Sequence, residues 1–68
     1  MVWVVRVYDI KTNRKLEERD YRSENGARNK IERTIENNPR VRCKLFQEIP
    51  GTFKQEELFS TTGSVWDF

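Results

Sequence analysis

The residue types that support catalysis are scarce in this chain of 68 residues. The sequence has no histidine and a single cysteine, Cys43. Nucleophiles activated by a histidine base and imidazole metal ligands are therefore excluded. Cys43 alternates with apolar residues, which indicates a buried small apolar group and not a reactive thiol. The three glycines lie too far apart in the sequence to form a phosphate-binding loop.

Carboxylate pairs are the remaining source of acid–base or metal chemistry. Glu17 and Glu18 are adjacent, as are Glu56 and Glu57, so on strands the members of each pair point to opposite faces. Asp9 and Glu17 could meet across a hairpin and recruit Mg²⁺ or Ca²⁺, but one exposed pair supplies far too few oxygen ligands for a dedicated site. We therefore interpret these acids as solvated charges and predict a non-enzymatic protein with no cofactor and no metal site.

Charge is distributed unevenly along the chain. Residues 1–44 carry 12 Lys and Arg against 7 Asp and Glu, a net +5, whereas residues 45–68 carry 1 against 4, a net −3. The overall charge is therefore only +2. Such an asymmetry can indicate a basic surface with an anionic partner, although small proteins also need many charges for solubility.

The first third of the chain predicts a β-hairpin. Residues 2–10, VWVVRVYDI, are dense in β-branched and aromatic side chains, which is typical of a largely buried strand. A three-residue loop at 12–14, with Asn13 suited to a left-handed conformation, would lead into a polar strand at 16–22. In that register Ile10 lies opposite Leu16 and Arg6 opposite Asp20.

Residues 23–39 predict the long helix. Ser23 is the expected N-cap, and the sequence Asn37-Asn38-Pro39 is the expected stop. Apolar residues recur every four positions on one stripe: Ala27, Ile31 and Ile35. On the exposed side we expect an ion pair between Arg28 and Glu32.

The last third predicts two more strands. Val41, Cys43, Leu45 and Ile49 alternate with basic and other polar residues, so one face is apolar and the other largely basic. After the Pro50-Gly51 turn, residues 53–60 match both a helix capping box and a strand, and we favour the strand. Residues 61–68 are apolar enough to add a strand or to dock as a tail.

These elements predict one α+β domain over residues 1–68, in the order ββαββ. An antiparallel sheet of order 2-1-3-4, with the helix packed on one face, places the most apolar strand inside and the charged second strand at an edge. The chain contains no apolar run long enough for a membrane span or a signal peptide, and a lone cysteine forms no internal disulfide. We therefore predict a cytoplasmic protein without membrane contact.

The face of the sheet away from the helix is the candidate site. The alternation assigns to it basic and aromatic residues, next to Val2 and Val4. The six candidate binding residues are Arg6, Tyr8, Arg22, Arg42, Lys44 and Phe46. An apolar and aromatic patch rimmed by arginines is typical of a protein interface.

Two alternatives compete with a protein interface at this face. A basic and aromatic platform also suits single-stranded nucleic acid or RNA, whose bases stack on exposed rings. Alternatively, residues 58–68 cover the face with Phe59, Trp66 and Phe68. We expect a small interaction module that modulates or inhibits a protein partner, as phage and mobile-element inhibitors do, and exposed Val2 and Val4 or a free edge strand could also pair two copies.

Overall fold

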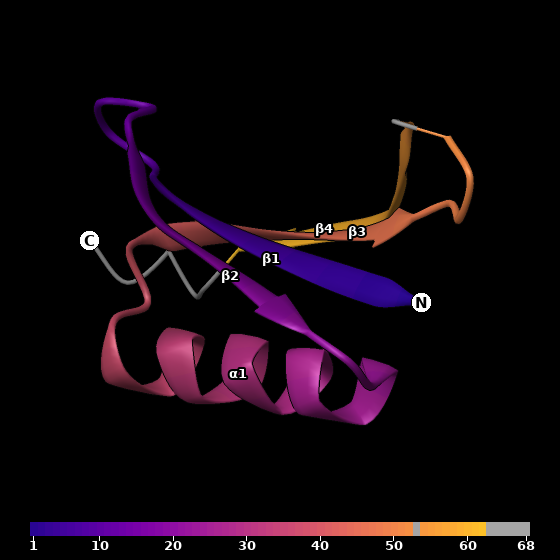
Figure 1. The fold of residues 1–68 in the computed structure, drawn as a ribbon. Helices are drawn as coiled ribbons and strands as arrows, with labels where there is room; N and C mark the ends of the chain where they lie inside the picture. Colours follow the sequence, from indigo (N-terminus) through magenta and orange to yellow (C-terminus); the bar gives the residue numbers. More distant parts are fainter. Residues whose placement is uncertain (53, 63–68) are drawn as a thin grey trace.

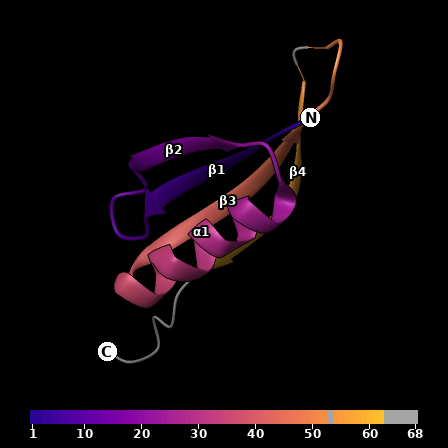
Figure 2. The ribbon, with the colours of Figure 1, turned by 60° about the horizontal axis from the view of Figure 1, so that its bottom comes forward.

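The computed structural model describes residues 1–52 and 54–62. The order ββαββ is as predicted, and its elements are β1 (Val2–Asp9), β2 (Lys15–Tyr21), α1 (Glu24–Asn37), β3 (Val41–Glu48) and β4 (Gln55–Thr62). The strands form one antiparallel sheet in the predicted order β2-β1-β3-β4. The helix packs on one face of this sheet (Figures 1 and 2). No helix in the described ranges is long and apolar enough to cross a membrane.

The core lies between α1 and the face of the sheet that the helix covers. Its buried side chains alternate along β1 and β3, as pleated strands require, and recur every four residues on α1. They are Val5, Val7, Ala27, Ile31, Val41, Cys43 and Leu45, with Trp3, Tyr21, Ile35 and Phe59 packed at the margin. The predicted apolar faces of the helix and of β3 from Val41 to Leu45 are therefore confirmed, whereas Ile49 is exposed.

The helix boundaries also match the prediction. The Ser23 Oγ accepts a hydrogen bond of 3.1 Å from the Gly26 backbone N–H, which satisfies one of the free donors of the first turn. The helix ends at Asn37, and the Asn38 N–H still donates to the Thr34 carbonyl at 2.9 Å. The expected ion pair of Arg28 with Glu32 is wrong, because the Arg28 Nε binds Glu24 Oε2 at 2.8 Å.

The register of the β1–β2 hairpin differs from the prediction by two residues. Arg6 lies opposite Glu18 and not opposite Asp20, and Leu16 is the extra residue of a β-bulge. The cause lies in the loop, where the Asp9 carboxylate accepts hydrogen bonds from the Lys11 and Thr12 N–H groups at 2.7 and 3.1 Å. Asp9 thereby closes the loop itself, and β2 begins one residue earlier than expected.

Residues 55–62 form the fourth strand, which confirms the strand interpretation of this region. The sequence 61–62 belongs to β4, whereas Phe53 and the tail 63–68 lie outside the described residues. A β-bulge at Leu58 separates Phe59, opposite Leu45 on the helix side, from Glu57, opposite Phe46 on the other side. Ile49 lies beyond the end of β3.

Candidate functional site

The face of the sheet away from the helix, called the outer face below, brings five of the six candidate residues together. Arg6 pairs with Lys44 across β1 and β3, and Tyr8 pairs with Arg42. Phe46 is the neighbour of this group on β3, opposite Val4. Arg22, the sixth candidate, follows the last residue of β2 and is exposed.

Both aromatic rings of the outer face are covered by cations. The Arg6 Cζ lies 4.6 Å from the centroid of the Phe46 ring, and the Lys44 Nζ lies 5.7 Å from the centroid of the Tyr8 ring. These are cation–π distances. The Arg6 Nη2 also donates to Gln55 Oε1 of β4 at 2.7 Å, so the guanidinium spans from β1 across β3. Arg6 and Lys44 thus fix the positions of the Phe46 and Tyr8 rings.

Carboxylates compensate most of the charge on the outer face. Glu18 accepts a hydrogen bond from the Arg6 Nε and lies 3.5 Å from the Lys15 Nζ, and Glu57 lies 3.8 Å from the Lys44 Nζ. The Arg6 hydrogen bond lowers the pKa of Glu18 below its ordinary value. Among the described residues Arg42, next to Tyr8 near the start of β3, forms no ion pair.

The outer face is less apolar than the sequence predicts. Val4 is only 2% exposed although no layer of the described chain covers it, because its neighbours on the strands enclose it. The prediction that Val2 and Val4 form an exposed apolar patch is therefore wrong for Val4. Phe59 cannot cover the outer face because it packs against the core on the opposite side. Trp66 and Phe68 lie outside the described residues.

The carboxylates considered for metal binding are bound elsewhere. Asp9 closes the hairpin loop, and Glu17 lies opposite Val7 and not opposite Asp9. Glu17 Oε1 lies 3.0 Å from the Lys30 Nζ of the helix and 2.8 Å from the Arg19 Nε, and these hydrogen bonds lower its pKa. The described residues contain no group of three or more metal-ligating side chains.

The single thiol lies in the middle of the core. Cys43 is fully buried on β3 between α1 and the sheet, and burial raises the pKa of its thiol. A protonated and inaccessible thiol is a poor nucleophile. This geometry agrees with the prediction of a core residue.

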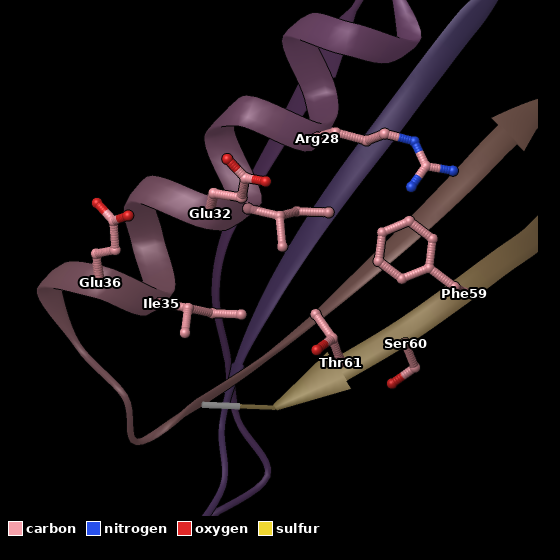
Figure 3. Close-up of a pocket in the computed structure, with 8 residues that line it drawn as sticks. Arg28, Glu32, Ile35, Glu36, Phe59, Ser60 and Thr61 are labelled. Atoms are coloured by element: carbon pink, nitrogen blue, oxygen red, sulfur yellow. The ribbon is translucent and has the colours of Figure 1, made fainter. Parts of the chain in front are cut away.

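A groove between α1 and β4 is the feature that sequence reasoning missed. It has a volume of about 580 Å³. Its lining residues are Arg28, Ile31, Glu32, Ile35, Glu36, Phe59, Ser60 and Thr61 (Figure 3). The bulge at Leu58 creates it by turning Phe59 toward the helix, and a bulge leaves no clear mark in the sequence.

The chain matches no family model, no curated protein and no solved structure. The geometry of the outer face is therefore the basis for the functional proposal below.

Proposed function

We propose that this chain is a non-enzymatic interaction module whose outer face binds a protein partner and modulates or inhibits it. The observation that carries the proposal is the pair of aromatic rings held under cations, Phe46 under Arg6 and Tyr8 under Lys44. Aromatic and arginine side chains dominate binding energy at protein interfaces, and side chains already fixed in place lose little entropy on binding.

The same geometry argues against nucleic acid as the partner. Base stacking requires open ring faces, but Arg6 and Lys44 occupy the space above both rings. Phosphate binding requires cations without competing anions, but Glu18 and Glu57 already compensate Arg6 and Lys44. A protein surface can exchange these contacts for equivalent ones of its own. Arg42, which has no ion-pair partner in the part of the chain that the structure describes, can then meet an acidic group of the partner.

We place this interaction in the cytoplasm of the host cell. Support comes from Cys43, a free buried thiol in a domain that holds together without a disulfide, which suits a reducing compartment.

Site-specific crosslinking tests the proposal. A photo-crosslinking amino acid replaces Arg42 on the outer face in one variant and Arg33, exposed on the helix, in a matched control. We expect one protein from the native host to crosslink at position 42 and not at position 33. With that protein purified, Phe46→Ala and Tyr8→Ala should each raise the dissociation constant at least about 30-fold, the level of an interface hot spot.

Three results would overturn this assignment. Equal crosslinking from positions 33 and 42 would remove the outer face as the interface, and unchanged affinity in both alanine variants would do the same. Tight binding of a 12-nucleotide oligo-dT that falls steeply between 50 and 200 mM salt, and is lost on Arg42→Glu, would establish nucleic acid as the partner instead. Circular dichroism and thermal unfolding of each variant show that the fold is retained.

A further inference from the structure

The groove between α1 and β4 has an apolar floor next to the edge of the sheet. Ile35 of the helix faces Phe59 of β4, and Thr61 points toward the helix whereas Ser60 points away (Figure 3). Ile31 also lines the groove. The helix packs against β1, β2 and β3, and no other described segment covers the inner side of β4 beside it. A side chain entering from the direction of the sheet edge would therefore meet apolar groups on both walls.

β4 is the edge strand on this side of the sheet formed by the described residues. From Phe59 to Thr62 its pairing with β3 is regular, because the bulge at Leu58 lies before this stretch. An edge strand carries a row of backbone donors and acceptors that can pair with another extended chain. A free edge beside a groove that accepts alternate side chains is the geometry used for recognition by strand addition.

The charged side chains around the groove determine which ligand charge it favours. Arg28 is already held by Glu24 at 2.8 Å, and its Cζ lies 4.8 Å from the Phe59 ring centroid. Glu32 and Glu36 are exposed on the helix along the groove and form no ion pair within the described ranges. The uncompensated charge along the groove is therefore negative.

We propose that this groove binds an extended, basic segment of a partner protein, which pairs with β4 as an added strand. A branched aliphatic side chain of that segment fills the space between Ile35 and Phe59. Arginines two residues before and after it lie on the same side of the added strand, because side chains alternate with a period of two, and reach Glu32 and Glu36. This site is on the opposite face of the sheet from the outer face, so it is independent of the function proposed above.

Fluorescence anisotropy with three labelled peptides tests the proposal on the full chain. The probe is Ac-TRTITRT-amide, in which Arg, Ile and Arg share one side of the strand. The control peptides are TETITET, with reversed charge, and TRTSTRT, without the aliphatic side chain. We expect the probe to bind at least 10-fold more tightly than either control, and a probe methylated on alternate backbone nitrogens to lose binding to the same extent.

Charge reversal on the protein separates a specific site from general attraction. The double variant Glu32→Lys/Glu36→Lys should bind TETITET in preference to TRTITRT. The matched control Asp20→Lys/Glu48→Lys changes the net charge equally but alters the opposite side of the molecule, and should keep the original preference. All four positions lie on the protein surface or its margin, so both variants should fold, which thermal unfolding verifies.

Several outcomes would overturn the proposal. They are a probe that fails to bind at millimolar concentration, equal binding of the three peptides, and equal effects of the two double variants. Contacts from residues 63–68 to Ile35 and Phe59 in the NMR spectra of the free chain would identify the chain's own C-terminal segment as the occupant. Concentration-dependent broadening confined to β4 would identify a second copy. Either finding would replace the peptide of a partner.

Discussion

Cys43 is a built-in reporter of the stability of this domain. Its thiol is fully buried between the helix and the sheet, so a thiol reagent such as dithiobis-nitrobenzoate reaches it only when the core opens. Globular domains are stable by about 0.05–0.15 kcal/mol per residue, which gives about 3–10 kcal/mol for a chain of this length. If opening of the core requires global unfolding, the thiol should react about 10²- to 10⁷-fold more slowly than in urea.

A matched pair of substitutions links the labelling rate to the core. Leu45 is a fully buried neighbour of Cys43 on the same strand face, and Leu45→Ala should destabilise the fold by about 3 kcal/mol through lost contacts and a cavity. Labelling of Cys43 should then be about 150-fold faster. Leu16→Ala is the control, because Leu16 is 55% exposed and such a substitution changes stability by less than about 0.5 kcal/mol.

Two results would refute this reasoning. Labelling within about 10-fold of the urea-unfolded rate would mean that Cys43 is accessible without unfolding. A Leu45→Ala variant that unfolds more readily by circular dichroism but labels at the wild-type rate would mean that local opening, independent of the core, exposes the thiol. Labelling through global unfolding should also follow the ordinary thiol pKa of 9.0 in its pH dependence, although burial raises the pKa in the folded chain.

Three further predictions concern single groups. Glu17 has a lowered pKa in the folded chain, so its ion pair with Lys30 stabilises the fold above pH 4.5, and this stability is lost as the pH falls through the folded pKa. The loss should be within about 1 kcal/mol because both side chains are partly exposed to solvent, and Glu17→Gln should reduce it in urea titrations at pH 6 and pH 3. Trp3→Phe should cost less than about 1 kcal/mol in the same titrations, because it removes a buried indole N–H that has no hydrogen-bond partner in the described structure, and a larger loss would reveal such a partner. Gly51→Ala should lower the free energy of unfolding by about 1–2 kcal/mol, since Gly51 has a φ of 78° and an added Cβ would meet no atom within 4 Å, so the whole cost is backbone conformation.

The elements of this fold could be predicted from the sequence because their signals are local. Alternation of apolar residues around Cys43, the four-residue repeat from Ala27, and the Ser23 cap each depend on a few neighbouring residues. The strand order also followed, because two hairpins and one crossover helix leave few arrangements of four strands.

The hairpin register could not be predicted, because it depends on competition between loop and cross-strand contacts. The expected register set Asp9 opposite Glu17, two like charges. In the structure Asp9 instead accepts two backbone hydrogen bonds in the loop, and Glu17 binds Lys30 of the helix. The resulting shift is two residues from Glu17 to Tyr21, and an even shift leaves these side chains on their predicted faces, whereas the bulge at Leu16 moves Lys15 to the outer face. The residues from β2 that were predicted on the outer face from 17 to 21 therefore remain correct, although their predicted cross-strand partners were wrong.

The bulge at Leu58, in contrast, made the predicted faces of β4 wrong. A single inserted residue moves every side chain on one side of the bulge to the other face of the sheet. Strict alternation places Glu57 and Phe59 on the same face. In the structure Glu57 joins the outer face, where it meets Lys44, and Phe59 joins the helix side. One local irregularity thus both compensates the charge of the outer face and opens the groove beside the helix.

The two halves of the chain, net +5 and net −3, meet on the sheet and compensate each other only in part. Glu57 and Gln55 of the acidic half contact Lys44 and Arg6 of the basic half, whereas Arg42, Asp20 and Glu48 of the same face form no ion pair among the described residues. On the opposite side of the sheet, Glu32 and Glu36 of the helix form no ion pair with any described residue. Because the sheet separates these charges, the overall charge of +2 describes neither surface. A basic partner of the groove would therefore be selected by the local negative charge of Glu32 and Glu36 and not by the charge of the whole chain.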